Sequence, residues 1–164
     1  MRYRRVYVAG GCYFFTVNLQ DKKSQLLVEQ VDLLREAVRT VKQRRPFKID
    51  AWVVLPNHLH AVWTLPENDT DYSGRWREIK KRFRHNLAQS KILSSSNSRF
   101  GNRQIWQHRF WEHTIRNEAD FNHHINYVHI NPLKHGLVKQ VKDWPYSSFH
   151  RAVADGYYSI NWCG

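Results

Sequence analysis

The chain has 164 residues, of which 41% are hydrophobic and 14% aromatic, and this composition fits one globular domain with a real core and excludes a disordered protein. The 26 Lys and Arg residues exceed the 14 Asp and Glu residues, and the net charge of +12 favours a polyanionic partner, most simply nucleic acid. No stretch approaches the roughly 18 apolar residues of a membrane span and nothing marks the chain for export, so we expect a cytoplasmic protein.

Charge alone leaves two alternatives open, a merely soluble basic surface and a surface that binds an anionic membrane. The two cysteines, Cys12 and Cys163, lie near opposite ends of the chain and form no CxxC or comparable cluster. The sequence therefore supports neither a disulfide framework nor a zinc knuckle.

The first predicted elements are a strand and a helix. The segment 12–19 is rich in aromatic and β-branched residues, which indicates a strand. The segment 24–46 predicts an amphipathic helix that begins at Ser24 as N-cap and closes at Pro46, and its apolar stripe should belong to the core without carrying chemistry. That stripe recurs at steps of three and four, at Leu27, Val31, Leu34, Val38 and Val41.

Two further strands, 47–55 and 58–65, are separated only by Pro56 and Asn57 and predict an antiparallel hairpin. Side chains alternate between the faces of a strand, so His58 and His60 should point to the same side. An apolar run would normally carry Val, Ile or Leu at such positions. The pair either holds a ligand or lies on a half-exposed strand face.

A second helix is predicted within residues 69–93, with an apolar face formed by Trp76, Ile79, Phe83 and Leu87. Basic residues crowd the remainder of this helix, which is either an ordinary solvated face or a surface that follows a phosphate backbone. These basic residues are Arg75, Arg77, Lys80, Lys81, Arg82 and Arg84. A serine-rich segment, 94–98, should be a flexible connector.

The C-terminal part predicts a strand over 104–115, a helix over 118–130 that stops before Pro132, and a tail that wraps the surface. The resulting βαββαβ order is typical of a ferredoxin-like α+β fold, with an antiparallel sheet, helices on one face, and the other face open for a site. We expect a single domain over 1–164, with a core to about residue 130 and a tail over about 131–164.

Four polar side chains could make up such a site. A His-x-His pair aims two imidazoles at one point in space, and imidazole is a common metal ligand. On the last helix, Tyr127 and Asn131 are four residues apart and therefore share a face. Tyr127 offers a phenol nucleophile and Asn131 an amide oxygen, although a packing aromatic and a helix-end cap would look the same. Spacing alone does not place this helix beside the histidine strand.

Several ordered blocks of the sequence resemble those of the REP-associated tyrosine transposases, relatives of the single-tyrosine HUH transposases. The resemblance covers essentially the whole chain from about Tyr3. The blocks are "YVAGGCYFFTVNL", "WVVLPNHLHAVWTLP", "RWREIKKRF", "WQHRFWEHTIRN", "HHINYVHINPLKHGLV" and "DWPYSSFHR".

The resemblance implies that His58 and His60 bind Mg²⁺ or Mn²⁺ and that Tyr127 is the nucleophile. Asn131 stands where related single-tyrosine transposases carry a polar ligand, often Gln. The implied reaction is metal-dependent cleavage and strand transfer of single-stranded DNA at repetitive extragenic palindromic hairpins, through a 5′-phosphotyrosine intermediate. His123 and His124 have either a proton-transfer role or, more simply, a packing role. The implied location is the nucleoid, and the active form is a monomer or a homodimer.

Residues that contact DNA follow from charge and aromaticity. The cations expected to bind phosphates are Arg2, Arg4, Arg5, Arg75, Arg77, Lys80, Lys81 and Arg84. Trp106, Trp111 and Trp144 are candidates for base stacking, although such residues more often belong to a core. Two other functions remain open: a non-catalytic single-stranded nucleic-acid-binding domain of the same fold, and a metal-dependent hydrolase that uses water as its nucleophile.

Overall fold

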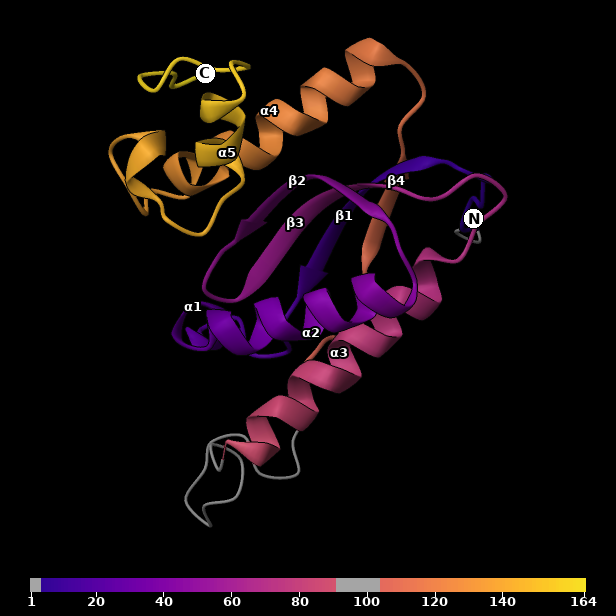
Figure 1. The fold of residues 1–164 in the computed structure, drawn as a ribbon. Helices are drawn as coiled ribbons and strands as arrows, with labels where there is room; N and C mark the ends of the chain where they lie inside the picture. The colour runs from indigo at the N-terminus through magenta and orange to yellow at the C-terminus, as the bar shows by residue number, and fades with distance from the viewer. Residues whose placement is uncertain (1–3, 91–103) are drawn as a thin grey trace.

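The structure, a computed structural model, describes residues 4–90 and 104–164 and contains a four-stranded antiparallel sheet between two helical layers (Figure 1). The strand order is β2-β3-β1-β4, as expected for the ferredoxin-like α+β fold that the sequence predicts. The strands are β1 (Cys12–Asn18), β2 (Lys48–Val54), β3 (His58–Thr64) and β4 (Trp111–Thr114). The predicted connector 94–98 and Arg2 lie outside the described residues.

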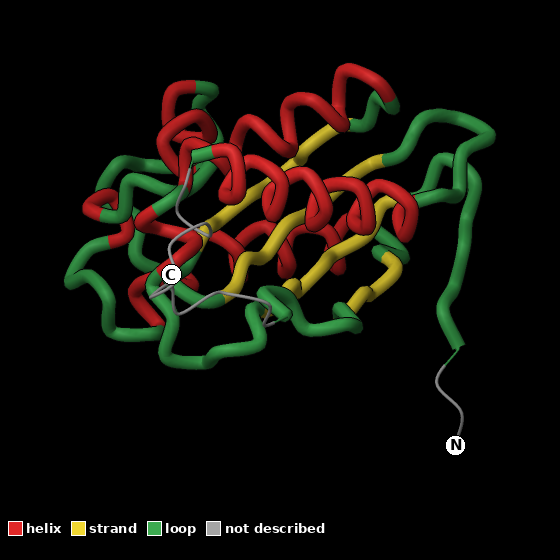
Figure 2. Tube along the Cα trace, turned by 90° about the horizontal axis from the view of Figure 1, so that it is seen from below, coloured by secondary structure: helices red, strands yellow, loops and turns green. Residues whose placement is uncertain are grey.

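Helices α2 (Val31–Arg44) and α3 (Tyr72–Gln89) pack side by side against one face of the sheet, as Figure 2 shows from below. This layer holds the larger core. The Trp63 and Trp76 rings stack with their centroids 4.2 Å apart, and Phe15 meets the Trp63 ring edge-on at 4.9 Å. Burial of such large aromatic surfaces supplies much of the free energy that holds these helices to the sheet.

The first predicted helix is in fact two, α1 (Leu26–Glu29) and α2, with the break at Gln30. The prediction of Ser24 as N-cap is wrong by one residue, because the N-cap is Gln25, without a side-chain cap hydrogen bond. Ser24 Oγ, just before it, accepts a hydrogen bond from the Leu26 backbone N–H at 3.1 Å. A break within an uninterrupted apolar stripe leaves no trace in periodicity, since Leu27 and Val31 are buried on either side of it.

The opposite face of the sheet, which we expected to stay open, is partly covered by α4 (Glu118–Lys134). Phe121, Ile125 and Val128 of this helix pack with Phe14 and Val62 of the sheet in a second, smaller core. The helix is held at its start by the Asn117 side chain, which accepts a hydrogen bond from the Asp120 N–H at 2.8 Å.

The prediction that this helix stops before Pro132 is wrong, because α4 runs through Pro132 to Lys134. Pro132 lies in the last turn, so the one helical hydrogen bond that its missing N–H removes is near the helix end, and only Leu133 and Lys134 follow it. Gly136, at φ +70°, then closes the helix. The Leu137 N–H donates to the Pro132 carbonyl and the Gly136 N–H to the Leu133 carbonyl, the two hydrogen bonds of a Schellman motif.

Strand β4 is also shorter than the predicted 104–115, since only Trp111–Thr114 pairs continuously with β1 and Trp106 forms a single isolated bridge with Leu19. The C-terminal segment lies along the free edge of β2, where the Val54 N–H donates to the Tyr146 carbonyl at 2.8 Å. This segment contains a short 3-10 turn, η1 (Val141–Asp143), and helix α5 (Phe149–Ala154). Among the described residues, no helix is long and apolar enough to cross a membrane.

Candidate active site

The four residues of the predicted site lie together on the α4 side of the sheet, within one chain. His58 and His60 project from β3, with ring centroids 5.0 Å apart. The Tyr127 ring of α4 stands edge-on to His60, at 5.3 Å and an interplanar angle of 74°. Asn131, one helical turn further, is fully buried and lies beside His60. The structure therefore brings these residues together, and their roles stay predictions.

Neighbouring side chains orient both imidazoles. Asn57 donates from Nδ2 to the Lys22 carbonyl, and its Oδ1 accepts from His58 Nδ1 at 2.6 Å, so that Nε2 of His58 carries the lone pair. Thr16 Oγ1 lies 2.8 Å from His60 Nδ1. Groups that hold one ring nitrogen in this way leave the other nitrogen fixed for a ligand.

Burial keeps the two histidines neutral at physiological pH. It lowers the pKa of His60 to about 3, with a further contribution from the charge of His58 when that ring is protonated. Burial likewise lowers the pKa of His58 to about 4, and a protonated His135 adds to the shift. A neutral imidazole presents a lone pair, which is the form that binds a metal ion.

The residues present fit a divalent cation. Within the described part of the chain, Nε2 of His60 and both Nδ2 and Oδ1 of Asn131 are buried without a hydrogen-bond partner. Buried polar atoms left unpaired are costly, and here they converge from two elements, so they are suited to binding an ion. Two imidazole nitrogens and one amide oxygen suit Mn²⁺ or another first-row ion at least as well as Mg²⁺, which prefers oxygen.

Four further residues at this site escaped the sequence reasoning. The Phe14 ring contacts both His60 and Tyr127, with centroids 5.5 and 5.6 Å away, and Thr16 holds His60. Lys134 places its Nζ 5.1 Å from the Tyr127 ring centroid, and His135 contacts His58 at 5.2 Å. Of these four residues, His135 could have been predicted from the sequence, because it lies one helical turn after Asn131.

The cations predicted to bind DNA differ in their surroundings. Arg75 is buried and donates to Asp69 and to the Arg45 and Pro46 carbonyls, so it holds the start of α3 against the end of α2 and is withdrawn from any phosphate. Arg5 pairs with Glu112 at 3.0 Å, and Lys80 donates to the Gln107 carbonyl at 2.9 Å. The four exposed members of the set are Arg4, Arg77, Lys81 and Arg84.

The three tryptophans proposed for base stacking also differ in their exposure to solvent. Trp106 is buried, and Trp144 is half-buried with its Nε1 donating to the Val54 carbonyl. Trp111 is 55% exposed. Its β4 position pairs with Thr16, which in turn pairs with His60, so Trp111 points to the same face of the sheet as the two histidines.

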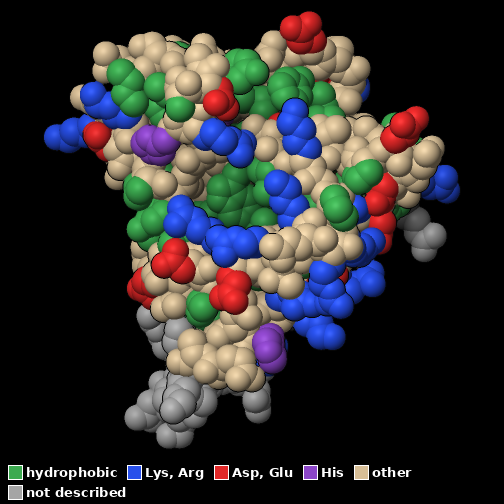
Figure 3. Space-filling model, in the orientation of Figure 1, with side chains coloured by type: hydrophobic (Ala, Val, Ile, Leu, Met, Phe, Trp, Pro, Cys, Tyr) green, Lys and Arg blue, Asp and Glu red, His purple; other side chains and the backbone are tan. Residues whose placement is uncertain are grey.

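A cationic groove lies at the β2 edge on the other side of the sheet (Figure 3). It has a volume of about 340 Å³, an apolar floor, and a rim of positive charge, with no acidic residue in its lining. The floor and rim comprise Val38, Ile49 and Trp52 with Arg35, Arg39, Lys42 and Arg151. The predicted helix 24–46 carries, besides its core stripe, Arg35, Arg39 and Lys42 on its polar side at helical spacing.

We expect the metal-free protein to lose stability as the pH falls from about 6.5 to about 4. The folded-state pKa values of His58, His60 and His129 are about 4, 3 and 4, below the unfolded value of 6.5. In this window the unfolded chain binds protons that the folded chain does not. The free energy of unfolding should therefore fall by a few kcal/mol, on the order expected for partly screened groups. Urea unfolding with a chelator at pH 7, 6 and 5 measures it.

The matched controls for this experiment are two histidines on α4. Replacing the buried His129 by Gln should reduce the pH dependence by the share of one of the three groups, whereas His123→Gln, at an exposed position outside that set, should leave this share in place. A midpoint urea concentration that does not change between pH 7 and pH 5 would contradict the burial argument.

Comparison with known proteins gives a consistent set of relatives. The chain is 56% identical to a REP-associated tyrosine transposase of Escherichia coli K12, over 99% of this chain and 90% of that protein. It is 40% identical to a Haemophilus influenzae protein described under the same family name, over 99% and 93% of the two chains. A solved REP-associated tyrosine transposase bound to a REP hairpin superposes with a TM-score of 0.88 at 55% identity, covering 100% of this chain and 92% of that one. No protein-family model matches the chain.

Proposed function

Because this chain belongs to the REP-associated tyrosine transposases, we propose that it cleaves and rejoins single-stranded DNA beside a palindromic hairpin, with Tyr127 as the nucleophile. The observation that carries the proposal is the contact between the Tyr127 and His60 rings. A phenol and a buried, unprotonated imidazole meet here although 67 positions separate them in the sequence. Since both belong to one chain, one protomer is sufficient to form the site.

The chemical step is an in-line displacement at phosphorus. The Tyr127 phenol oxygen forms a bond to the phosphorus, and the bond between that phosphorus and the 3′-oxygen breaks. The phenol proton is released to solvent or a nearby base, and the departing 3′-oxygen takes up a proton. A 5′-phosphotyrosine and a free 3′-hydroxyl result, and attack by another 3′-hydroxyl reverses the step and transfers the strand without a nucleotide energy source.

The residues that would hold a divalent cation are His58, His60 and Asn131. When bound, Mg²⁺ or Mn²⁺ supplies positive charge that polarises and orients the scissile phosphate. The protein contributes the rest. Asn57 and Thr16 fix the two imidazoles, Phe14 supports the Tyr127 ring, and Lys134 adds positive charge beside it.

The DNA partner is inferred from the relative solved with a REP hairpin bound. Phosphates of the substrate would meet the exposed cations Arg4, Arg77, Lys81 and Arg84 and the rim of the cationic groove. Trp111 offers an exposed ring on the catalytic face, which suits stacking with an unpaired base. Trp106 is unsuited to that role, because its ring is buried.

The groove rim gives a direct prediction for DNA binding. Replacing Arg39 and Lys42 by Ala should weaken hairpin binding by roughly 10- to 100-fold and reduce the slope of log affinity against log salt by about 2, since each cation that neutralises a phosphate adds about one unit. Neither side chain has a hydrogen bond or ion pair in the described structure, so the fold should not suffer. Fluorescence anisotropy at several salt concentrations measures both quantities.

The charge-matched control for this prediction is the pair Lys139→Ala and Lys142→Ala, which removes two positive charges away from the groove lining. An equal loss of affinity in both double variants would mean that net charge, and not the groove, determines binding.

The proposed activity is tested by incubating the purified chain with a labelled single strand that carries a palindrome and its flanking bases, in the presence of Mn²⁺. We expect a labelled protein band that survives denaturation, and its loss when a chelator is added. Cleavage without such a band would favour the hydrolase alternative. Binding without any cleavage would favour a non-catalytic domain.

A further inference from the structure

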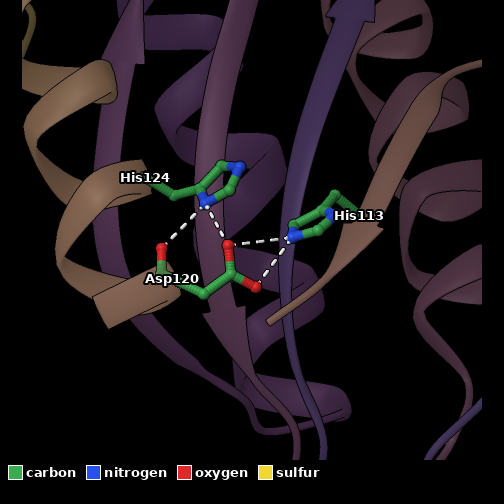
Figure 4. Close-up of side chains that lie close together, drawn as sticks. All are labelled: His113, Asp120 and His124. Atoms are coloured by element: carbon green, nitrogen blue, oxygen red, sulfur yellow. Dashed lines mark hydrogen bonds and ion pairs between the residues drawn. The ribbon is translucent and has the colours of Figure 1, made fainter. Parts of the chain in front are cut away.

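A second cluster of ligand-type side chains lies where β4 meets the start of α4 (Figure 4). His113 comes from β4, while Asp120 and His124 stand one turn apart on the same face of α4. The His113 and His124 rings are stacked with their centroids 4.5 Å apart, and each presents one nitrogen to the Asp120 carboxylate. None of these residues belongs to the His58, His60 and Asn131 set.

The spacing of the three ligand atoms matches a small coordination sphere. His113 Nε2 lies 2.9 Å from Asp120 Oδ2, His124 Nδ1 lies 3.1 Å from Asp120 Oδ1, and all three ligand atoms lie within 4.8 Å of one another. An ion with bonds of about 2.0–2.1 Å in tetrahedral geometry holds neighbouring ligands about 3.4 Å apart. Small side-chain rotations therefore convert this cluster into three ligands of one ion.

The Asp120 carboxylate carries the negative charge that attracts a cation, and the cluster is partly shielded from water. Although burial opposes it, the hydrogen bonds from His113 and from the Arg116 backbone N–H lower the pKa of Asp120 to about 2, so its carboxylate is ionised. The Asp120 and His124 side chains are only 10% and 16% exposed, and Phe14 covers the His124 ring with centroids 4.9 Å apart. Partial burial strengthens the attraction between a carboxylate and a cation.

We propose that His113, Asp120 and His124 form a second metal site, which binds a divalent first-row ion such as Zn²⁺ and ties the tyrosine-bearing helix to the sheet. Two imidazoles and one carboxylate are ligands typical of this ion class, and water completes the shell. The site lies on the same helix as Tyr127, one turn before it, and Phe14 contacts both His124 and Tyr127. An ion here would therefore fix α4 on β4 at the end that precedes the nucleophile.

In the structure, hydrogen bonds occupy the same atoms. His124 Nδ1 lies 2.8 Å from the Asp120 carbonyl oxygen, and His113 Nε2 is within 3.1 Å of both carboxylate oxygens. The ion would replace the protons of these hydrogen bonds, so binding should release protons and weaken at acidic pH.

The test is the number of Zn²⁺ ions bound per chain by the full-length protein after removal of metal with a chelator, measured by calorimetry and by metal analysis after dialysis. We expect two in the wild type and one in the His58→Ala, His60→Ala double variant. Adding Asp120→Asn or His113→Asn to that double variant should leave none. The retained ion should raise the melting temperature of the double variant and not that of either triple variant. Circular dichroism verifies that each variant is folded.

His123→Asn in the same double variant is the matched control, because His123 is exposed, adjacent to His124 and outside the cluster. It should retain one ion. The proposal is overturned if the double variant binds no Zn²⁺, or if its ion survives both Asp120→Asn and His113→Asn. A further outcome is that the wild type binds a single ion, that Asp120→Asn loses it and that the double variant keeps it. This outcome would support the second site and count against metal binding at His58 and His60.

Discussion

Replacement of Tyr127 by Phe is expected to abolish the covalent protein–DNA adduct and to reduce strand cleavage by on the order of 10⁴-fold or more, because no other oxygen takes the place of a removed nucleophile. Phe retains the ring that packs edge-on against His60 and Phe14. The fold and hairpin affinity should therefore stay within about twofold of wild type. Denaturing electrophoresis of labelled DNA measures the adduct, and anisotropy measures binding.

The control for this variant is Tyr157→Phe, which removes a phenol from a side chain that is 79% exposed and distant in sequence from the site. It should cleave as wild type does. If Tyr127→Phe still forms an adduct that resists denaturation, another residue is the nucleophile, and the proposed role of α4 fails with it.

Replacement of His60 by Ala is expected to have the second largest effect, the loss of metal-dependent cleavage with hairpin binding retained. Removing a group that only orients a ligand typically costs 10- to 100-fold in metal affinity or activity, so removing the ligand itself should cost more. The structure provides a graded comparison, because Thr16 Oγ1 holds His60 Nδ1 at 2.8 Å. Thr16→Val should therefore cost roughly 10- to 100-fold, and His60→Ala at least about tenfold more.

Cleavage rates at increasing Mn²⁺ concentration distinguish the two variants. Excess Mn²⁺ should restore cleavage by Thr16→Val, in which the His60 ligand is present but loosely held. It should fail to restore cleavage by His60→Ala. Unchanged cleavage in His60→Ala would exclude this histidine as a metal ligand, whatever the result for Tyr127→Phe.

The sequence predicted the fold correctly wherever strand alternation or helical periodicity ran without interruption. Strand alternation and helical periodicity correctly indicated the βαββαβ order and the core faces of both large helices. The boundaries were less certain, for physical reasons visible in the structure. Pro132 sits in a last turn completed by a glycine cap, and the break at Gln30 falls within a continuous apolar stripe.

The cations show why a charged sequence does not by itself define a binding surface. Arg75 and Arg77 are two positions apart on α3, yet the first is buried against backbone carbonyls and Asp69 while the second is exposed. A helix turns by about 100° per residue, so which arginine faces the protein depends on what packs beside the helix. Arg35, Arg39 and Lys42 meet Arg151 only because the C-terminal segment returns to the β2 edge.

Within each element, the sequence alone determined the directions of the reactive groups. Alternation along β3 sets His58 and His60 on one face, and helical spacing sets Tyr127 and Asn131 on another. Only the tertiary structure decided that these two faces meet. That outcome depends on Phe121, Ile125 and Val128 of α4 packing on Phe14 and Val62 of the sheet, since contacts between segments distant in the chain are fixed by complementary packing and not by periodicity.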